Sequence, residues 1–211
     1  MSAAARISET IYRLDGPLRC VVGEANELIR KTRLRPGATV LDVGAGTGYL
    51  SIPLARVVGE TGSVHSLDTC SELLEVLRAK ALRQGCTHRL TITRGSALCL
   101  NYPDHFFDFV FSSYTLHELV DPMPALCEMQ RVLKPLGEVA ISDYRRIQDE
   151  GRRAEIEGWY AQQADQNGER EEHLRFSLEA MERMLLSAGF SEIQLSTWLD
   201  FHMHVVATKL D

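Results

Sequence analysis

Short apolar runs alternate with helix-like patterns along most of the chain from residue 36 onward. Runs rich in β-branched and aromatic residues predict five strands, at residues 39–44, 63–68, 89–95, 107–113 and 138–144. Between these runs, apolar residues recur at the spacing of one helix face. Strands that alternate with helices are typical of repeated βαβ units, so the pattern predicts a mostly parallel sheet with helices on both faces.

Two of the predicted helices have marked ends. Thr69 and Glu72 have the T-x-x-E spacing of a capping box, which predicts that a helix begins there. Asp121 as N-cap and Pro122 in the first turn predict a second helix, which continues until Pro135 stops it.

The last part of the chain has a different pattern. Ser177 caps a predicted helix at residues 178–189, and strand patterns follow at residues 191–197 and 202–209 with a very short link between them. A parallel pair needs a crossover of about a dozen residues, so these two strands must pair antiparallel. The predicted fold is a Rossmann-like, seven-stranded, mostly parallel α/β sheet with a C-terminal antiparallel hairpin.

Composition narrows the function classes. The 211 residues are 45% hydrophobic and carry a net charge of -6, which suits one domain and disfavours nucleic acid or an anionic membrane surface as a partner. The 5 cysteines include no C-x-x-C pair, and no carboxylate–histidine cluster indicates a metal site. No apolar run approaches the roughly 18 residues of a spanning helix. We expect a cytoplasmic monomer or homodimer, without membrane insertion, that acts on a small molecule.

Two segments stand apart from the predicted sheet. Residues 1–35 are predicted to form a helical cap over the site or an arm packed on the surface. Residues 145–175 are unusually rich in charge and are predicted to form a helical insert. This insert is either a solvated helix with an aromatic anchor or a lid that faces the substrate. We expect both segments to belong to one domain spanning residues 1–211.

The stretch VLDVGAGTGYLS, residues 40–51, is the most informative motif. In open α/β sheets, ligands bind beyond the carboxyl ends of the strands, where Gly44, Gly46 and Gly48 let the backbone turn and approach a ligand closely. The spacing D-x-G-x-G-x-G differs from the dinucleotide fingerprint G-x-G-x-x-G. The carboxylate of Asp42 disfavours a pyrophosphate and suits an ammonium or another donor group.

Asp68 ends the next predicted strand, where a carboxylate can accept hydrogen bonds from ribose hydroxyls. Adenosine-binding sites of several kinds use such a residue. Asp68 therefore indicates a ribose without distinguishing a nicotinamide cofactor from S-adenosylmethionine, whereas Asp42 favours the latter.

With these motifs, the sequence resembles the class I S-adenosylmethionine-dependent methyltransferases, particularly the small-molecule branch similar to ubiquinone/menaquinone-biosynthesis methyltransferases. The resemblance rests on VLDVGAGTGYLS, SLDTCSELLE, FDFVFSSYTLHEL and RVLKPLGEVAISDY. It covers residues 36–144 strongly and the C-terminal helix and hairpin moderately, while residues 145–175 match no motif. Leu136 departs from the family, which usually has glycine in this turn. The resemblance implies S-adenosyl-L-methionine as cofactor and methyl transfer to a small-molecule acceptor.

The resemblance also implies roles for the residues of the first motif. Gly44, Gly46 and Gly48 would line the methionine part of the cofactor. Asp42 would lie near the ammonium of the cofactor, and Asp68 would hold its ribose.

Further cofactor contacts are implied after the second, third and fourth predicted strands. Thr69 would flank the adenine, and Ser96 and Ala97 would contact its amino group. The family usually has an acidic residue at Ser96, so this bond would be made without charge. Ser112 and Ser113 would offer backbone groups to the amino end of the cofactor and face the reacting methyl group.

Methyl transfer is an in-line displacement, so holding the two reactants aligned supplies much of the catalysis. A general base is needed only when the acceptor must lose a proton. His117 and Tyr114 are the predicted catalytic residues, with a packed histidine and a tyrosine of the pocket wall as the alternatives. Asp143 and Tyr144 are predicted to lie in the acceptor site.

Two other functions stay open from the sequence. One is an NAD(P)-dependent Rossmann oxidoreductase, which Asp68 permits and the glycine spacing disfavours. The other is a non-catalytic regulatory protein that binds S-adenosylmethionine, which Ser96 and the lack of an evident base permit.

Overall fold

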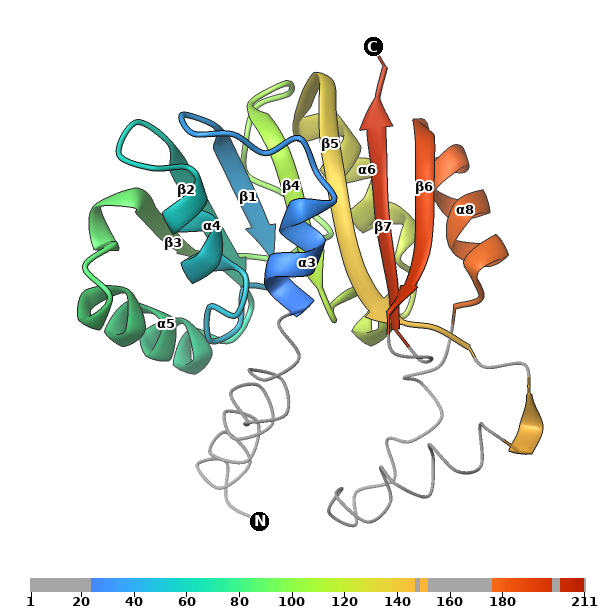
Figure 1. The fold of residues 1–211 in the computed structure, drawn as a ribbon, viewed down its shortest axis with the longest axis horizontal. Helices are drawn as coiled ribbons and strands as arrows, with labels where there is room; N and C mark the ends of the chain where they lie inside the picture. Colours follow the sequence, from blue (N-terminus) through green and yellow to red (C-terminus); the bar gives the residue numbers. More distant parts are fainter. Residues whose placement is uncertain (1–23, 147–148, 152–175, 199–201, 211) are drawn as a thin grey trace.

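The computed structural model describes residues 24–146, 149–151, 176–198 and 202–210. One sheet holds seven strands in the order β3-β2-β1-β4-β5-β7-β6 (Figure 1). The strands are β1 (Thr39–Val43), β2 (Ser63–Asp68), β3 (Leu90–Arg94), β4 (Phe107–Ser113), β5 (Leu133–Tyr144), β6 (Phe190–Trp198) and β7 (His202–Lys209). The predicted fold class is confirmed.

Strand direction follows the prediction as well. β1 pairs in parallel with β2 and β4, and the parallel set continues to β3 on one side and β5 on the other. β7 is antiparallel to both β5 and β6, so the C-terminal hairpin closes the sheet. The carboxyl ends of the five parallel strands therefore share one edge of the sheet, and chain order reverses between β1 and β4.

Helices cover both faces of the sheet (Figure 1). One apolar cluster joins the sheet to α3 (Glu24–Arg30), α4 (Ser51–Val57) and α5 (Ser71–Arg83). A second cluster, on the other face, joins it to α6 (Met123–Val132) and α8 (Leu178–Ser187). The short 3-10 helices are η1 (Thr87–Arg89) and η2 (Leu116–Glu118). Within the described residues, no helix has both the length and the apolar character needed to cross a membrane.

Helix starts agree with the sequence at Ser177 and differ from it at Asp121 and Thr69. The hydroxyl of Ser177 accepts a hydrogen bond from the amide of Ala180 at 3.1 Å, as a cap should. The N-cap predicted at Asp121 is wrong, because α6 begins at Met123 with Pro122 as its N-cap, although the carboxylate of Asp121 accepts the amide of Met123 at 2.9 Å. The capping box at Thr69 is wrong, because α5 begins at Ser71 with Cys70 as its N-cap.

The beginning of β5 also differs from the sequence prediction. Helix α6 ends at Val132, and Leu133 is already extended with ψ 140 and pairs with Phe107. The strand therefore begins before the predicted residue 138. Pro135 explains this early end of the helix, because a proline disfavours helical geometry in the residue before it. Leu136 then adopts φ 63 where the family usually has glycine.

The predicted N-terminal and charged segments lie largely outside the described residues. Of residues 1–35, the structure describes 24–35, which include α3. Of residues 145–175, it describes 145–146 and 149–151. Arg145 bridges to Phe176, so the two ends of the charged segment lie side by side. The roles of both segments stay predictions.

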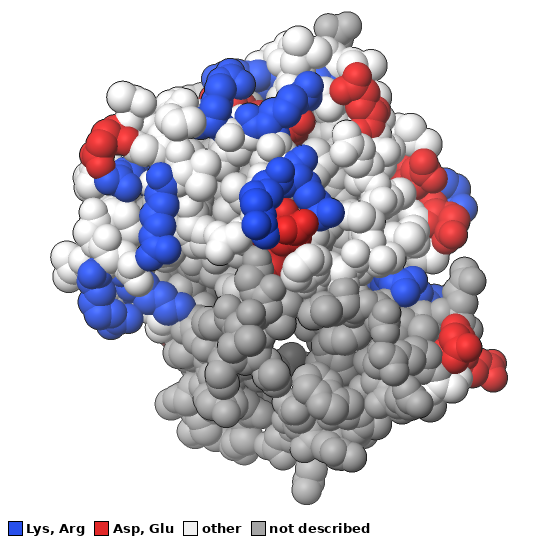
Figure 2. Space-filling view, viewed as in Figure 1, with Lys and Arg blue, Asp and Glu red and all other residues white. Residues whose placement is uncertain are grey.

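Lys and Arg side chains gather over α3 and α5 in Figure 2, although the net charge of the chain is -6. Carboxylates of the same helices offset part of this charge. Glu27 pairs with Arg30 and Lys31, and Glu75 pairs with Arg78. The absence of a nucleic-acid partner stays a prediction from net charge.

Candidate functional site

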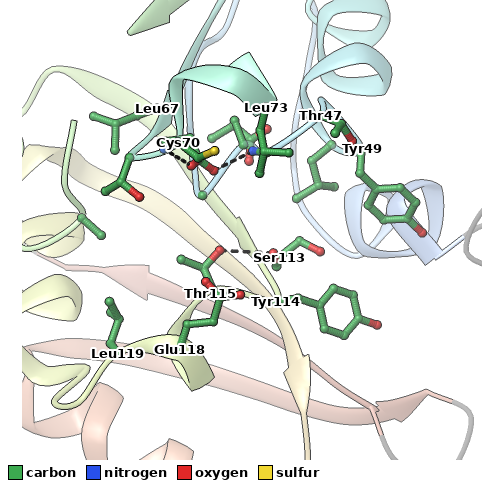
Figure 3. Close-up of a pocket in the computed structure, with 18 of the residues that line it drawn as sticks. Thr47, Tyr49, Leu67, Cys70, Leu73, Ser113, Tyr114, Thr115, Glu118 and Leu119 are labelled. Carbon is green, nitrogen blue, oxygen red and sulfur yellow. Dashed lines mark hydrogen bonds between the residues drawn. The ribbon is translucent and has the colours of Figure 1, made fainter. Parts of the chain in front are cut away.

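A cavity of about 470 Å³ opens at the carboxyl ends of β1, β2 and β4, within the size range of small-molecule sites. Its wall brings together eight of the ten residues predicted to bind a cofactor. They are Asp42, Gly44, Gly46, Asp68, Thr69, Ser96, Ala97 and Ser113. Gly48 and Ser112 are not among the lining residues. Tyr114 lines the same cavity (Figure 3), and so do His117 and Tyr144.

The glycine loop has the geometry that only glycine tolerates easily. Gly44, Gly46 and Gly48 have φ values of 75, 49 and 91, all in the left-handed region. A Cβ on Gly44 would lie 1.9 Å from Oγ1 of Thr115, and one on Gly48 would lie 2.3 Å from Cδ1 of Leu77. Gly48 thus allows α5 to pack close to the loop, whereas Gly44 and Gly46 form the wall of the cavity.

Asp42 is fully buried beneath this loop. Its Oδ2 accepts a hydrogen bond from the hydroxyl of Ser51 at 2.5 Å, and that hydroxyl accepts one from Ser66 at 2.8 Å. Burial raises the pKa of the Asp42 carboxyl to about 7, the Ser51 bond opposes this shift, and the charge of Asp68 adds to it. A cationic ligand group in the cavity would favour the anionic form.

Asp68 joins the loops that follow β1 and β2. Its Oδ2 accepts the amide N–H of Gly46 and its Oδ1 accepts that of Cys70, each at 2.8 Å. A carboxylate has about four acceptor positions, so two such bonds leave room for hydroxyl donors from a ribose. Arg94 donates a hydrogen bond to the carbonyl of Thr69 at 3.0 Å and holds the backbone beside this residue.

Serines mark two other parts of the wall. The hydroxyl of Ser113 is buried and accepts or donates no hydrogen bond among the described residues, so a ligand can supply its partner. The hydroxyl of Ser112 is also buried and unpaired there, but it lies away from the cavity. The hydroxyl of Ser96 accepts the amide of Leu98 at 3.2 Å, which stabilises the turn at the predicted adenine position.

His117, in η2, and Asp143, near the end of β5, form a buried pair. The distance from Nδ1 of His117 to Oδ1 of Asp143 is 2.7 Å, and the other oxygen accepts the amide of His117 at 3.2 Å. The amide of Tyr144 also donates to Asp143, at 2.8 Å. His117 is 4 % exposed and Asp143 is fully buried. The carboxylate therefore fixes the orientation of a histidine that lines the cavity.

Tyr114 directs its hydroxyl to a residue that the sequence did not indicate. That hydroxyl donates a hydrogen bond to Oε2 of Glu24, the first residue of α3. The ring of Tyr114 lies 4.8 Å from the ring of Tyr144, between centroids, and both line the cavity. This geometry suits the predicted alternative of a pocket wall better than an acid–base role.

Several site residues escaped the sequence interpretation. Glu24, Ser51 and Ser66 act through contacts between elements, and Thr115 fills the space that the missing Cβ of Gly44 leaves. Only Ser51 had a usable signal, because it closes the glycine motif. Among the described residues, no group of three or more His, Cys, Asp or Glu side chains is placed to hold a metal ion.

Comparison with known proteins identifies the family. A family model described as a methyltransferase domain matches residues 34–185. The chain belongs to this methyltransferase family. A 2-phytyl-1,4-naphthoquinone methyltransferase of Trichormus variabilis is 34% identical over 154 residues, which are 71% of this chain and 67% of that protein.

Two further relatives bear on cofactor and fold. The ubiquinone/menaquinone biosynthesis C-methyltransferase of Francisella philomiragia is 36% identical over 120 residues, 57% of this chain and 48% of that protein. The chain thus spans about half the length of this curated methyltransferase. A solved S-adenosylmethionine-dependent methyltransferase of Aquifex aeolicus has a TM-score of 0.77 and 26% identity, with 96% of this chain and 98% of that chain covered.

The cofactor of the methyltransferase domain is S-adenosyl-L-methionine, which decides against a nicotinamide cofactor. The described residues fit this molecule. The cavity presents two carboxylates, Asp42 and Asp68, for a ligand rich in donor groups, and the buried hydroxyl of Ser113 lacks a partner. The roles of Asp42 at the ammonium, of Asp68 at the ribose and of Ser96 with Ala97 at the adenine stay predictions.

Proposed function

We propose that this methyltransferase domain methylates a flat, hydroxylated aromatic small molecule, with His117 as the general base. The observation that carries the proposal is that His117 lines the cavity that also contains Asp42 and Asp68, while the buried carboxylate of Asp143 binds its Nδ1 from behind the wall. A non-catalytic binding protein has no need of a buried, carboxylate-oriented histidine beside its ligand. The same pair is the arrangement expected for proton removal from an acceptor.

When bound, S-adenosyl-L-methionine supplies an electrophilic methyl group carried on a sulfonium. An anionic Asp143 accepts the N–H of Nδ1, which leaves the lone pair of the neutral imidazole on Nε2. His117 then takes the proton from a hydroxyl of the acceptor and makes the acceptor a better nucleophile. Asp143 stabilises the imidazolium that forms, because its carboxylate lies 2.7 Å from Nδ1.

The aromatic wall supports a flat acceptor. The rings of Tyr114 and Tyr144 are 4.8 Å apart, and those of Tyr144 and His117 are 5.0 Å apart. Stacking against such rings favours a planar ligand. The relatives' names point the same way, since both enzymes are named for quinones. A hydroquinone is flat and carries the hydroxyl that His117 would deprotonate.

A screen with methyl-labelled S-adenosyl-L-methionine tests the proposal. It should span hydroquinones, simple phenols, thiols, amines and arsenite, with the wild type beside His117→Asn. We expect label on hydroquinones or phenols and a loss of kcat of about 100-fold or more in the variant. The variant should bind S-adenosylhomocysteine as the wild type does. Transfer only to thiols, amines or arsenite would contradict the acceptor class.

Calorimetry separates the alternative functions. Binding of S-adenosylhomocysteine without transfer to any acceptor would favour the regulatory protein, and tighter binding of NAD would favour the oxidoreductase. We propose a cytoplasmic enzyme that acts as a monomer or homodimer without nucleic acid. The net charge of -6 supports the absence of a nucleic-acid partner.

A further inference from the structure

Glu24 is a buried carboxylate that the proposed reaction does not use. It is the first residue of α3 and only 2 % exposed. Its Oε2 accepts the hydroxyl of Tyr114, and its Oε1 accepts the hydroxyl of Ser142. Nε2 of His204 lies 3.2 Å from the same Oε1. A charge buried this deeply is costly unless it is paired, so these contacts define its role.

The partners of Glu24 converge from three separate strands. Tyr114 follows β4, Ser142 lies in β5 and His204 lies in β7. The backbones of Tyr114 and Ser142 are also joined, because the amide of Tyr114 donates to the carbonyl of Ser142 at 2.8 Å. Tyr114 and Ser142 are therefore connected twice: by this backbone hydrogen bond, and through their hydroxyls, which both donate to Glu24. Asp143, which orients His117, directly follows Ser142.

Tyr114 needs such support. Its φ of 53 is in the left-handed region, which residues other than glycine rarely adopt. A second tyrosine of the cavity contacts the same helix end, since the hydroxyl of Tyr49 accepts the amide of Ala25 at 3.3 Å. Figure 3 shows the rings of Tyr49 and Tyr114 pointing to the same side of the cavity. The first turn of α3 thus forms hydrogen bonds with the hydroxyls of both Tyr49 and Tyr114.

The charges around Glu24 keep it anionic. Burial alone would raise the pKa of the Glu24 carboxyl, but bonds from His204, Ser142 and Tyr114 and the charge of His202 bring it below the usual range. An anion is acceptor-only, so it takes the proton of the Tyr114 hydroxyl and turns that hydroxyl toward α3.

We propose that Glu24 is a positioning residue for the acceptor side of the cavity. It holds the Tyr114 hydroxyl on α3, so that the Tyr114 ring forms an aromatic wall and His117 remains the acid–base group. Through Ser142 it also fixes the strand end that carries Asp143 and Tyr144. This inference rests on the proposed function for its consequence, but the contacts that it describes can be tested without activity.

The first test is hydrogen–deuterium exchange of full-length Glu24→Gln against the wild type. Gln keeps the shape but has one acceptor oxygen where Glu24 has two, so it cannot accept the hydroxyls of both Tyr114 and Ser142 on separate oxygens. We expect at least ten-fold faster exchange at the Tyr114 amide. Glu27→Gln, on the same helix but paired with Arg30 and Lys31, is the matched control and should exchange as the wild type. Unchanged exchange in Glu24→Gln would overturn the proposal.

The second test is binding of 1,4-dihydroxynaphthalene, a flat diphenol, under argon with S-adenosylhomocysteine present. We expect at least five-fold weaker binding of this probe to Glu24→Gln and an unchanged Kd for S-adenosylhomocysteine. Tyr114→Phe should add less than two-fold to the effect of Glu24→Gln, because both changes break one contact. Faster exchange with unchanged probe binding would show a merely structural role and overturn the proposal.

The probe and label experiments fail in different ways. A wild type that does not bind the probe overturns the positioning proposal, whatever its activity. A wild type that binds the probe but transfers no label to any acceptor overturns the proposed function, and the effect of Glu24→Gln on probe binding still decides the role of Glu24.

Discussion

The cavity has a predicted cofactor half, which contains Asp42, Gly46 and Asp68, and a proposed acceptor half around Tyr114 and His117. The two halves are assembled in different ways. The cofactor half uses residues close in sequence: Gly46 and Asp68 are 22 residues apart, and Asp42 and Ser51 are 9 apart. The acceptor half depends on distant pairs, since Tyr114 is 90 residues from Glu24 and His204 is 180 residues from it. Local motifs therefore identify the cofactor, whereas the proposed acceptor site forms only when β4, β5, β7 and α3 come together.

Because different elements build the two halves, we expect substitutions in each half to have separate effects on cofactor binding and on turnover. A change in the cofactor half should alter binding of S-adenosylhomocysteine and leave the acceptor side in place. A change in the acceptor half should reduce turnover and leave cofactor binding unchanged. Thr115 links the two halves, because its hydroxyl donates to the carbonyls of Val43 and Ser113 at 3.4 and 3.2 Å.

Asp143→Asn should give the largest effect. An amide cannot replace the carboxylate that orients His117, so we expect kcat to fall by about 100- to 1,000-fold. Calorimetry with S-adenosylhomocysteine should show less than a two-fold change in Kd. An equal loss of cofactor affinity would show that the two halves are not separable in this way.

Gly44→Ala should produce the opposite result in the cofactor half. The new Cβ would clash with Thr115, and φ 75 would be strained, so we expect about 100-fold weaker binding of S-adenosylhomocysteine. Gly85→Ala is the control, because Gly85 has φ 67 with nothing within 4 Å of its Cβ position. It should cost about 1 kcal/mol of stability and leave binding intact. Similar affinities for both variants would contradict a role for close packing in the loop.

A smaller effect is expected from pH on the binding of the cofactor product. The Asp42 carboxyl, with its pKa raised to about 7, is neutral below that value and anionic above it. The anion attracts the ammonium of S-adenosylhomocysteine, so affinity should rise by about five- to ten-fold from about pH 6 to about pH 7.5. Calorimetry at several pH values should show this rise in the wild type and none in Asp42→Asn. A parallel rise in the variant would assign the pH dependence to another group.

Leu136→Gly should give the smallest effect and touch neither half. Leu136 is 68% exposed with φ 63, so glycine relieves strain and should raise stability by about 0.5–1 kcal/mol. We expect the melting temperature to rise by about 2 °C. Leu82→Gly, at an exposed position inside α5, should lower stability by about 1 kcal/mol instead. Destabilisation by Leu136→Gly would show that the Leu136 side chain supports the turn.

The fold was largely predictable because periodicity reports burial directly. The run at 107–113 became β4 without change, since its residues are buried on both faces of the sheet. The errors lie at element ends: the capping box failed at Thr69, and β5 began early at Leu133. At such ends, a few local hydrogen bonds and long-range strand pairing compete on nearly equal terms, and a sequence pattern records only the local part.

The sequence by itself determined the sheet, the glycine loop and the positions of Asp42 and Asp68, the two carboxylates predicted to bind the cofactor. These features depend on local backbone geometry and on the position of each residue at the end of its own strand. Only the tertiary structure decided that Asp143 orients His117 and that Glu24 binds Tyr114. The physical reason is that a buried charge acquires its role from the donors around it, and those donors come from strands that folding brings together.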